Sequence, residues 1–169
     1  MKSTTNNTLG YTGIVTLSQY TRNKKIIVAR KHNQGGNSLF NFIADSLAGD
    51  FDIARLERPT KILPLKISEN ASGEKEIQKA SNTNFIQLLT NPEKVPSVSS
   101  GIVRYSFIIP SDVLTDSDFN AIGLYAASAT EADFENYAAI CTIDDIDRNN
   151  ISISSMLVVD WELIITNKA

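Results

Sequence analysis

The chain has 169 residues, 42% of them hydrophobic, and a formal net charge of −3 at pH 7, a composition typical of one globular domain. No apolar run approaches the roughly 18 residues of a membrane-spanning helix, and the mild charge gives neither a basic surface for nucleic acid nor a polybasic segment for a membrane. The single cysteine, Cys141, excludes an intramolecular disulfide and a cysteine-built zinc site, and it indicates synthesis in a reducing cytoplasm.

The N-terminal part of the chain predicts a polar lead-in followed by a hairpin. Residues 1–12 lack the apolar segment of a secretory signal and are expected to be flexible, which leaves 13–169 as a single domain. The β-rich runs Gly13–Tyr20 and Lys24–Lys31 are separated by the short polar stretch TRN, so a hairpin is the simplest interpretation.

One short α-helix is predicted near residues 38–48. Asn37 or Ser38 can cap its N-terminus, and Gly49 can supply the left-handed residue that ends it. Apolar residues recur at helical spacing and are expected to form its core face, which consists of Leu39, Phe40, Phe42, Ile43 and Leu47.

The middle of the chain predicts less regular structure. Residues 50–59 are expected to form a linker that ends at Pro59. Residues 60–68 alternate between an apolar side and a side that contains Pro64, and a proline on the outer face favours an edge strand. Residues 85–89 predict a short strand or a turn.

The C-terminal third predicts strands joined by polar turns. Residues 101–110 alternate in polarity, and residues 119–128 are apolar on both faces. The last strand has one face made of Leu157, Val159, Trp161, Leu163 and Ile165. This period-two pattern predicts a mainly β fold, an antiparallel β-sandwich of jelly-roll-like type with the one short helix.

The glycine pair Gly35-Gly36 lies where the second strand meets the helix, a place where many proteins bind phosphate. A phosphate-binding Walker loop needs a lysine followed by Ser or Thr, and here Asn37 and Ser38 follow instead. The dinucleotide pattern of three spaced glycines is also absent. The pair is therefore interpreted as a sharp corner between strand and helix.

His32 and Cys141 are the residues through which nucleophilic catalysis would have to run, because His32 is the only histidine. Cys141 lies in the apolar run AAICTI and is interpreted as a core residue. One imidazole with carboxylates makes a poor zinc site. The prediction is of no catalytic residue, no cofactor and no metal site.

Two acidic clusters show the one-three-five oxygen spacing that opens a calcium loop. Both lack the glycine at position six and the glutamate at position twelve, so turn chemistry is the preferred interpretation and a loosely held calcium ion stays open. The clusters are Asp116, Asp118 and Asn120, and Asp145, Asp147 and Asn149.

Asp160 and Glu162 share one face of the last strand, where solvent or a contact between subunits is a simpler explanation than glycosidase chemistry. Asn6, Asn70 and Asn150 match the glycosylation pattern, and in a chain rich in Asn, Ser and Thr these are read as chance matches. Because strands that are apolar on both faces need covering by a sheet, a helix or a neighbouring chain, the pattern favours a binding or assembly protein.

The order of the segments resembles bacteriophage tail-fibre and baseplate-associated proteins. The N-terminal HNQGGNSLFNFIADSLAGD followed by RPTKILPL looks like the corner, helix and strand of phage virion proteins. The C-terminal resemblance consists of Asn120, Ile122, Gly123, Leu124 and Tyr125, and then Val159, Trp161, Leu163 and Ile165.

The resemblance implies a virion structural protein of tail-fibre, baseplate or collar type that attaches one part of a particle to another. It implies a homo-oligomer, a trimer or a higher ring, whose subunits pack through apolar sheet faces and dock to other virion proteins. The alternative is a carbohydrate-binding β-sandwich module for a host-surface glycan, which would need Trp161 to be exposed. A hydrolase that uses His32 and an acidic partner ranks third.

Overall fold

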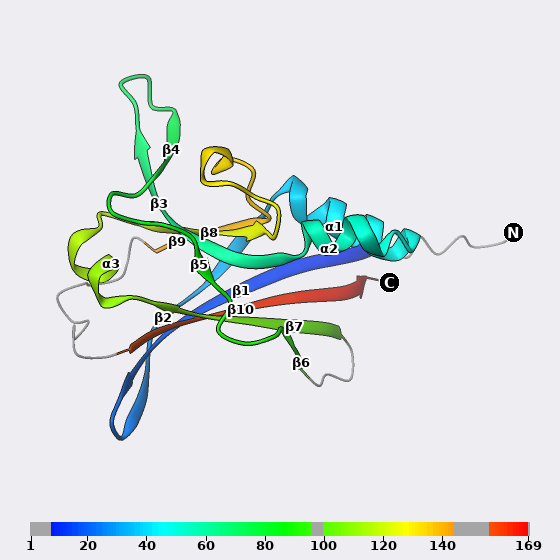
Figure 1. Ribbon diagram of the computed structural model, residues 1–169, viewed down its shortest axis with the longest axis horizontal. Coiled ribbons are helices and arrows are strands. Elements are labelled where there is room, and N and C mark those ends of the chain that lie inside the picture. The colour runs from blue at the N-terminus through cyan, green and yellow to red at the C-terminus, as the bar shows by residue number, and fades with distance from the viewer. Residues whose placement is uncertain (1–7, 96–99, 144–155, 169) are drawn as a thin grey trace, which may run out of the picture.

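The structure, a computed structural model, describes residues 8–95, 100–143 and 156–168 and has a mainly antiparallel β fold (Figure 1). The expected mainly β, sandwich-like architecture is confirmed. The strands are β1 (Thr8–Thr21), β2 (Lys24–Gly35), β3 (Pro59–Glu69), β4 (Lys75–Lys79), β5 (Ile86–Gln87), β6 (Glu93–Val95), β7 (Ser100–Ile109), β8 (Ala121–Ala126), β9 (Ala139–Thr142) and β10 (Met156–Lys168). The helices are α1 (Asn37–Ala48), α2 (Phe51–Glu57) and α3 (Ser111–Asp116), with a 3-10 turn η1 at Glu131–Asp133.

The strands form two layers that β2 joins. The hydrogen-bonded order is β4-β3-β8-β9-β2-β1-β10-β7-β6, with β5 beside β3. Up to Asn33 β2 pairs with β1, whereas Gln34 and Gly35 pair with β9. The first layer is therefore β2-β1-β10-β7-β6, and the second layer is β4-β3-β8-β9 with β5 (Figure 1).

The N-terminal hairpin is confirmed and is longer than expected. β1 begins at Thr8, before the expected Gly13, because it pairs along its whole length with β10, from Thr8 opposite Lys168 to Tyr20 opposite Met156. The first and last strands of the described chain are thus neighbours at the centre of the first layer.

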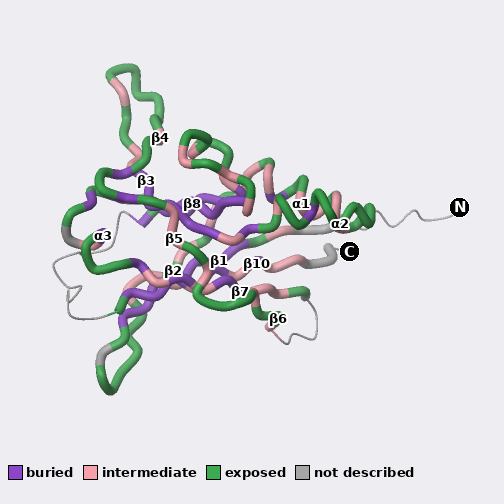
Figure 2. Tube along the Cα trace, in the orientation of Figure 1, coloured by how far each residue is buried: buried purple, intermediate pink, exposed green. Residues whose placement is uncertain are grey.

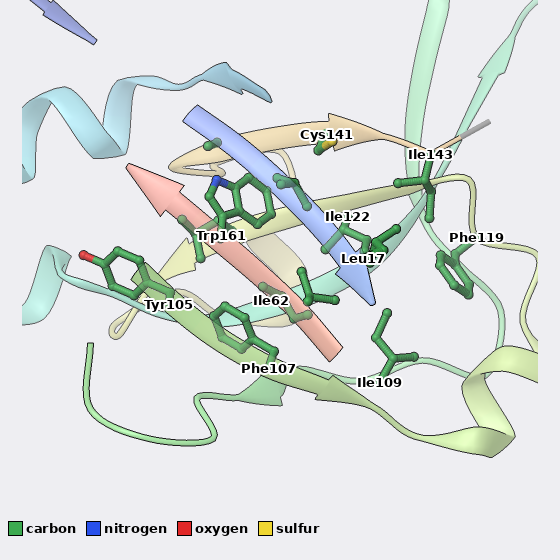
Figure 3. Close-up of a cluster of buried hydrophobic side chains, with 14 of the residues drawn as sticks. Leu17, Ile62, Tyr105, Phe107, Ile109, Phe119, Ile122, Cys141, Ile143 and Trp161 are labelled. Atoms are coloured by element: carbon green, nitrogen blue, oxygen red, sulfur yellow. The ribbon is translucent and has the colours of Figure 1, made fainter. Parts of the chain in front are cut away.

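The main core lies between the two layers. Figure 3 shows Leu17, Phe107 and Trp161 of the first layer among side chains of the second layer such as Ile62 and Ile122. All five are fully buried, and burying an apolar side chain of this size contributes roughly 1.5–3 kcal/mol. The alternation predicted for β7 and β10 is confirmed, and the indole of Trp161 belongs to the core rather than to a surface.

The outer face of the second layer is covered by the chain itself. Residues 127–138, here called the cover segment, place Phe134 and Tyr137 over β3, β8 and β9. The Tyr125 hydroxyl donates to the Phe134 carbonyl at 2.5 Å, and burial raises the pKa of Tyr125. All of β8 is buried, as the two-sided apolar pattern required (Figure 2). This sheet face is consequently covered by the chain itself, and the packing of subunits through apolar sheet faces stays a prediction.

Lys61 fastens the cover segment to β3. Its ammonium group donates to the carbonyls of Ala127 at 3.0 Å and Ala129 at 2.5 Å, and it lies 4.4 Å from the ring centroid of Phe85. Burial lowers the pKa of Lys61, although the nearby Glu131 carboxylate opposes that effect. Its two hydrogen bonds offset much of the cost of burying the charge.

The prediction that Thr60–Ser68 is an edge strand is wrong, because β3 lies between β8 on one side and β4 and β5 on the other. Pro64 lies in the gap between β5 and β4, where its carbonyl still accepts from the Ala80 N–H at 3.2 Å. The Thr83 hydroxyl donates to the Ala80 carbonyl at 2.7 Å and so replaces the N–H that proline lacks.

The helices differ from expectation in two respects. The predicted helix is confirmed and Gly49 ends it with φ of 81°, but the N-cap is Gly36 and not Asn37 or Ser38. The prediction that residues 50–59 form a linker is wrong, because they contain α2. Asp50 caps that helix by accepting from the Ile53 N–H at 3.4 Å.

Candidate functional site

The glycine pair forms the expected corner, because it allows two backbone segments to touch. Gly36 donates its N–H to the Ala138 carbonyl at 2.7 Å, and a Cβ on Gly36 would lie 2.2 Å from the Tyr137 carbonyl oxygen. A cleft of about 370 Å³ borders this corner and is lined in part by Glu135. A carboxylate at that position disfavours a bound anion.

His32 and Cys141 are neighbours, but the contact between them involves the His32 backbone and not its imidazole. The Cys141 Sγ lies 3.9 Å from the backbone carbonyl oxygen of His32, whereas the His32 side chain is exposed on β2. Burial raises the pKa of the Cys141 thiol to about 11, so at neutral pH the sulfur is a protonated core atom.

The first acidic cluster holds strands and turns together. The Asp118 carboxylate accepts from the backbone N–H and the hydroxyl of Ser81, both at 3.0 Å, and the backbone hydrogen bond is the main cause that lowers the pKa of Asp118. The Asn120 side chain accepts from the Ile67 N–H at 2.7 Å and donates to the Ile67 carbonyl at 2.8 Å. These contacts point the Asp118 carboxylate at the turn after β4 and the Asn120 side chain at β3 instead of at one ion.

Asp160 and Glu162 lie on the outer face of the first layer in cross-strand contacts. Asp160 accepts from the Ser106 hydroxyl at 2.6 Å, and Glu162 accepts from Arg104 Nη2 at 2.7 Å and Nε at 3.1 Å. The hydrogen bond to Glu162 is the main cause that raises the pKa of Arg104. Each carboxylate therefore stabilises a pair of neighbouring strands.

Of the remaining sequence patterns, the glycosylation sequon at Asn70 lies within the described residues. The Asn70 side chain shapes the turn between β3 and β4 by accepting from the N–H groups of Ser72 at 2.9 Å and Glu74 at 3.0 Å. The acidic cluster at 145–149 and the sequons at Asn6 and Asn150 lie outside the described residues.

An exposed apolar surface covers the two N-terminal helices. We call it the helix-pair surface, and it consists of Phe40, Leu47, Phe51, Ile53 and Leu56. Leu47 and Phe51 are each 73% exposed. The inner side of α1 packs on the core through Leu39. α1 therefore has apolar side chains on its inner side and on its outer side. Helices with apolar residues all round are usually buried on all sides.

The two helices contact each other through carboxyl groups as well. The pKa of Glu57 is raised, first by burial and then by its hydrogen bond to Asp45. A hydrogen bond between the Glu57 carboxyl group and its neighbour favours the protonated form of Glu57 and so raises its pKa. The helix pair is thus acidic at its base and apolar on its outer side.

A second exposed surface is the end of the hairpin, residues 20–31, which we call the hairpin tip. It has three exposed apolar side chains, Tyr20, Ile26 and Ile27. It also contains five basic residues and no acidic one: Arg22, Lys24, Lys25, Arg30 and Lys31. Lys25 lies 3.8 Å from the Asp160 carboxylate and 5.6 Å from the ring centroid of Tyr20. The turn between β1 and β2 extends away from the two layers (Figure 1), whereas Arg30 and Lys31 lie opposite Thr16 and Val15 of β1.

The composition of the described residues sets further bounds on the site. Across residues 8–95, 100–143 and 156–168, no group of three or more His, Cys, Asp and Glu is arranged to hold a metal ion. None of the described helices has both the length and the apolar character of a membrane span. Comparisons of the chain with protein-family models, with curated proteins and with solved structures give no match.

Sequence reasoning missed both surfaces. It placed Phe40 and Leu47 on the core face of the helix, whereas the structure exposes them and turns Leu39 inward. The available signal was the number of apolar residues in α1, which exceeds what one buried face can take. The sign and density of charge in residues 20–31 was the corresponding signal for the hairpin tip.

Proposed function

We propose that this protein is a structural assembly component that self-associates and docks to other proteins of a bacteriophage particle, of tail-fibre, baseplate or collar type. The helix-pair surface is the observation that carries the proposal. The particle class comes from the resemblance of the segments described above, and the structure supports the assembly role through its exposed surfaces.

The area of the helix-pair surface matches that of an interface. Its five exposed fractions amount to about three fully exposed side chains, or roughly 500 Å² of apolar area at about 150–200 Å² each. The largest apolar patch on a typical soluble monomer is about 300–600 Å² and is often functional. A standard interface buries about 800 Å² on each partner, somewhat more than half of it apolar.

The rest of the fold supports a scaffold that presents this surface rigidly. The helices rest on the core through Leu39, and the glycine corner fixes α1 to the end of β9. The polar side chains that first suggested chemistry, Asp118, Asp160 and Glu162, are engaged in contacts between strands. A rigid surface loses little conformational entropy when a partner binds.

The carbohydrate-binding alternative is less well supported. It needed Trp161 on an exposed sheet face, and this residue, the chain's only tryptophan, is fully buried. Weak quenching of Trp161 fluorescence by added glycans is therefore the expected result.

Two measurements test the proposal. Sedimentation velocity of the purified full chain over a wide range of concentration is expected to show reversible self-association. Quantitative mass spectrometry of purified particles from a lysed producer culture is expected to find the chain at a fixed ratio to the capsid protein. A chain that stays monomeric at every concentration and occurs only in the soluble fraction would overturn the proposal.

A further inference from the structure

We infer that two clefts beside the cover segment form one binding groove for an uncharged oligosaccharide. This inference goes beyond the proposed assembly role and does not depend on self-association. The groove lies on the outer side of the second layer, whereas Trp161 is buried between the two layers. It is therefore a different place from the tryptophan surface considered above.

The cover segment stands between α1 and β4 and leaves a cleft on each side (Figure 1). The cleft towards α1 measures about 370 Å³ and the cleft towards β4 about 500 Å³, both within the roughly 300–1,000 Å³ of sites for small ligands. Glu135 and Tyr137 line both clefts, so one ligand can extend from one cleft to the other across Tyr137. The groove therefore suits an elongated ligand.

The cleft towards α1 is lined by uncharged polar side chains that are available to a ligand. Within the described part of the chain, four of these side chains make no hydrogen bond to another residue: Asn37, Ser38, Asn41 and Asn136. By contrast, Asp118 and Glu162 are already engaged in contacts between strands and turns. Amide and hydroxyl side chains both donate and accept hydrogen bonds, as each sugar hydroxyl does, so the cleft matches a sugar.

The charges of the groove disfavour an anion. Its two carboxylates, Glu76 and Glu135, outnumber its one ammonium group, that of Lys75. Glu135 is also the one charged residue among the described residues that line the cleft towards α1. An anionic ligand would meet net repulsion, whereas a carboxylate accepts hydrogen bonds from neutral hydroxyl groups.

Tyr137 provides the apolar contact that a sugar ring needs beside its hydroxyl groups. The residue is half-buried, its side chain packs on the core of the second layer, and its carbonyl lies against Gly36. A ring held in this way loses little conformational entropy when a ligand contacts it.

An extended peptide is the competing occupant, because β4 is an edge strand that pairs only with β3 among the described strands. A peptide strand would pair with the backbone of β4 and leave the unbonded amides beside α1 unused. The side chains of the cleft towards α1 therefore favour the oligosaccharide.

Isothermal titration and saturation-transfer NMR of the full chain test the inference. The neutral probes are maltotriose, cellotriose, mannotriose and triacetylchitotriose, and the anionic probe is trigalacturonic acid, each at up to about 5 mM so that millimolar affinities are detected. At least one neutral trisaccharide is expected to bind, and trigalacturonic acid at least about tenfold more weakly. The fluorescence of the buried Trp161 should change little.

Three variants and a matched control locate the site. Asn41→Ala and Asn136→Ala each remove hydrogen-bonding groups from the cleft towards α1, and Gln78→Ala does so for the cleft towards β4. Each should weaken binding of the trisaccharide by about fivefold, the effect of one hydrogen bond. Asn84→Ala is the control, because Asn84 is an exposed asparagine that lines neither cleft. All four residues are exposed, so each variant is expected to fold, which circular dichroism checks.

The contrary outcomes are distinct. The inference is wrong if no neutral trisaccharide binds, including the case in which a blocked polar hexapeptide binds instead. It is also wrong if trigalacturonic acid binds equally well, or if Asn84→Ala weakens binding as much as the other variants do. Unchanged binding by Gln78→Ala would refute the continuous groove. None of these results touches the proposed function, whereas a monomeric chain that is absent from particles and binds a neutral trisaccharide would overturn the proposed function alone.

Discussion

Gly36→Ala tests whether the glycine corner holds the helix pair against the sheet. The backbone of Gly36 is extended, with φ of −114°, so alanine has no difficulty with the backbone conformation. The difficulty is contact, because the new Cβ would lie 2.2 Å from the Tyr137 carbonyl oxygen, where ordinary contact begins near 3.4 Å. The corner has to open by roughly 1 Å, and the hydrogen bond to the Ala138 carbonyl opens with it.

The expected loss is about 2 kcal/mol of unfolding free energy. A lost backbone hydrogen bond costs about 1 kcal/mol and an overpacked site about 1–3 kcal/mol. The lower entropy of the unfolded alanine chain offsets about 0.5 kcal/mol. With a denaturant slope of about 2 kcal/mol per molar urea, the unfolding midpoint should fall by about 1 M.

Trp161 provides the assay, since it is the only tryptophan and is fully buried. Its fluorescence follows urea unfolding at one fixed protein concentration, because self-association adds stability that depends on concentration. Gly101→Ala is the control, because Gly101 is exposed and a Cβ there meets no atom within 4 Å. Equal midpoints for Gly36→Ala and Gly101→Ala would refute the reasoning.

Three further predictions concern other buried or coupled groups. Lys61→Met should lower the unfolding free energy by about 1–3 kcal/mol in the same urea assay, because two carbonyls lose their donor. The control Lys79→Met removes an exposed ion pair with Glu131 and should change the unfolding free energy by less than about 1 kcal/mol. Glu57→Gln should raise the urea midpoint at neutral pH: the pKa of Glu57 is raised in the folded state, so wild type gains stability as pH falls through that pKa and the variant does not. The Cys141 thiol, with its pKa raised to about 11, should react with a thiol reagent at least about a hundredfold more slowly in the native protein than in urea.

Each of these has a contrary outcome. A loss for Lys61→Met below about 1 kcal/mol, no larger than that for an exposed ion pair, would mean that the cover segment does not depend on the buried ammonium. A stability gap between Glu57→Gln and wild type that persists unchanged into acid would show that the carboxyl is not the cause. Rapid labelling of native Cys141 would place the sulfur outside the core.

Strands were easiest to predict from the sequence where polar and apolar side chains alternate. β7 and β10 face solvent on one side, so Arg104, Ser106, Asp160 and Glu162 alternate with the core residues and reveal the strands. The hairpin could be predicted for a related reason, because two β-rich runs are separated by a short polar turn. The two-sided burial of β8 was also readable, since both its faces are apolar.

The failures have tertiary causes. α2 is one of the shortest helices here, and seven residues give too few turns to show a period. β3 looked like an edge strand because nothing local to Pro64 shows that Thr83 supplies the missing donor. The exposure of Phe40 and Leu47 was unreadable for a similar reason, since only the packing of α1 on the sheet decides which side of an apolar helix faces out.

The pairing of β1 with β10 has a consequence for how the protein is made. The centre of the first layer joins the earliest and the latest described strands, so β1 leaves the ribosome long before its partner exists. Until then the inner edge of the nascent hairpin is an unsatisfied template for other strands. Folding dominated by such distant contacts is slow, on a scale of milliseconds to seconds. Biosynthesis thus imposes a waiting period during which chaperones and neighbouring nascent chains compete for the same strand.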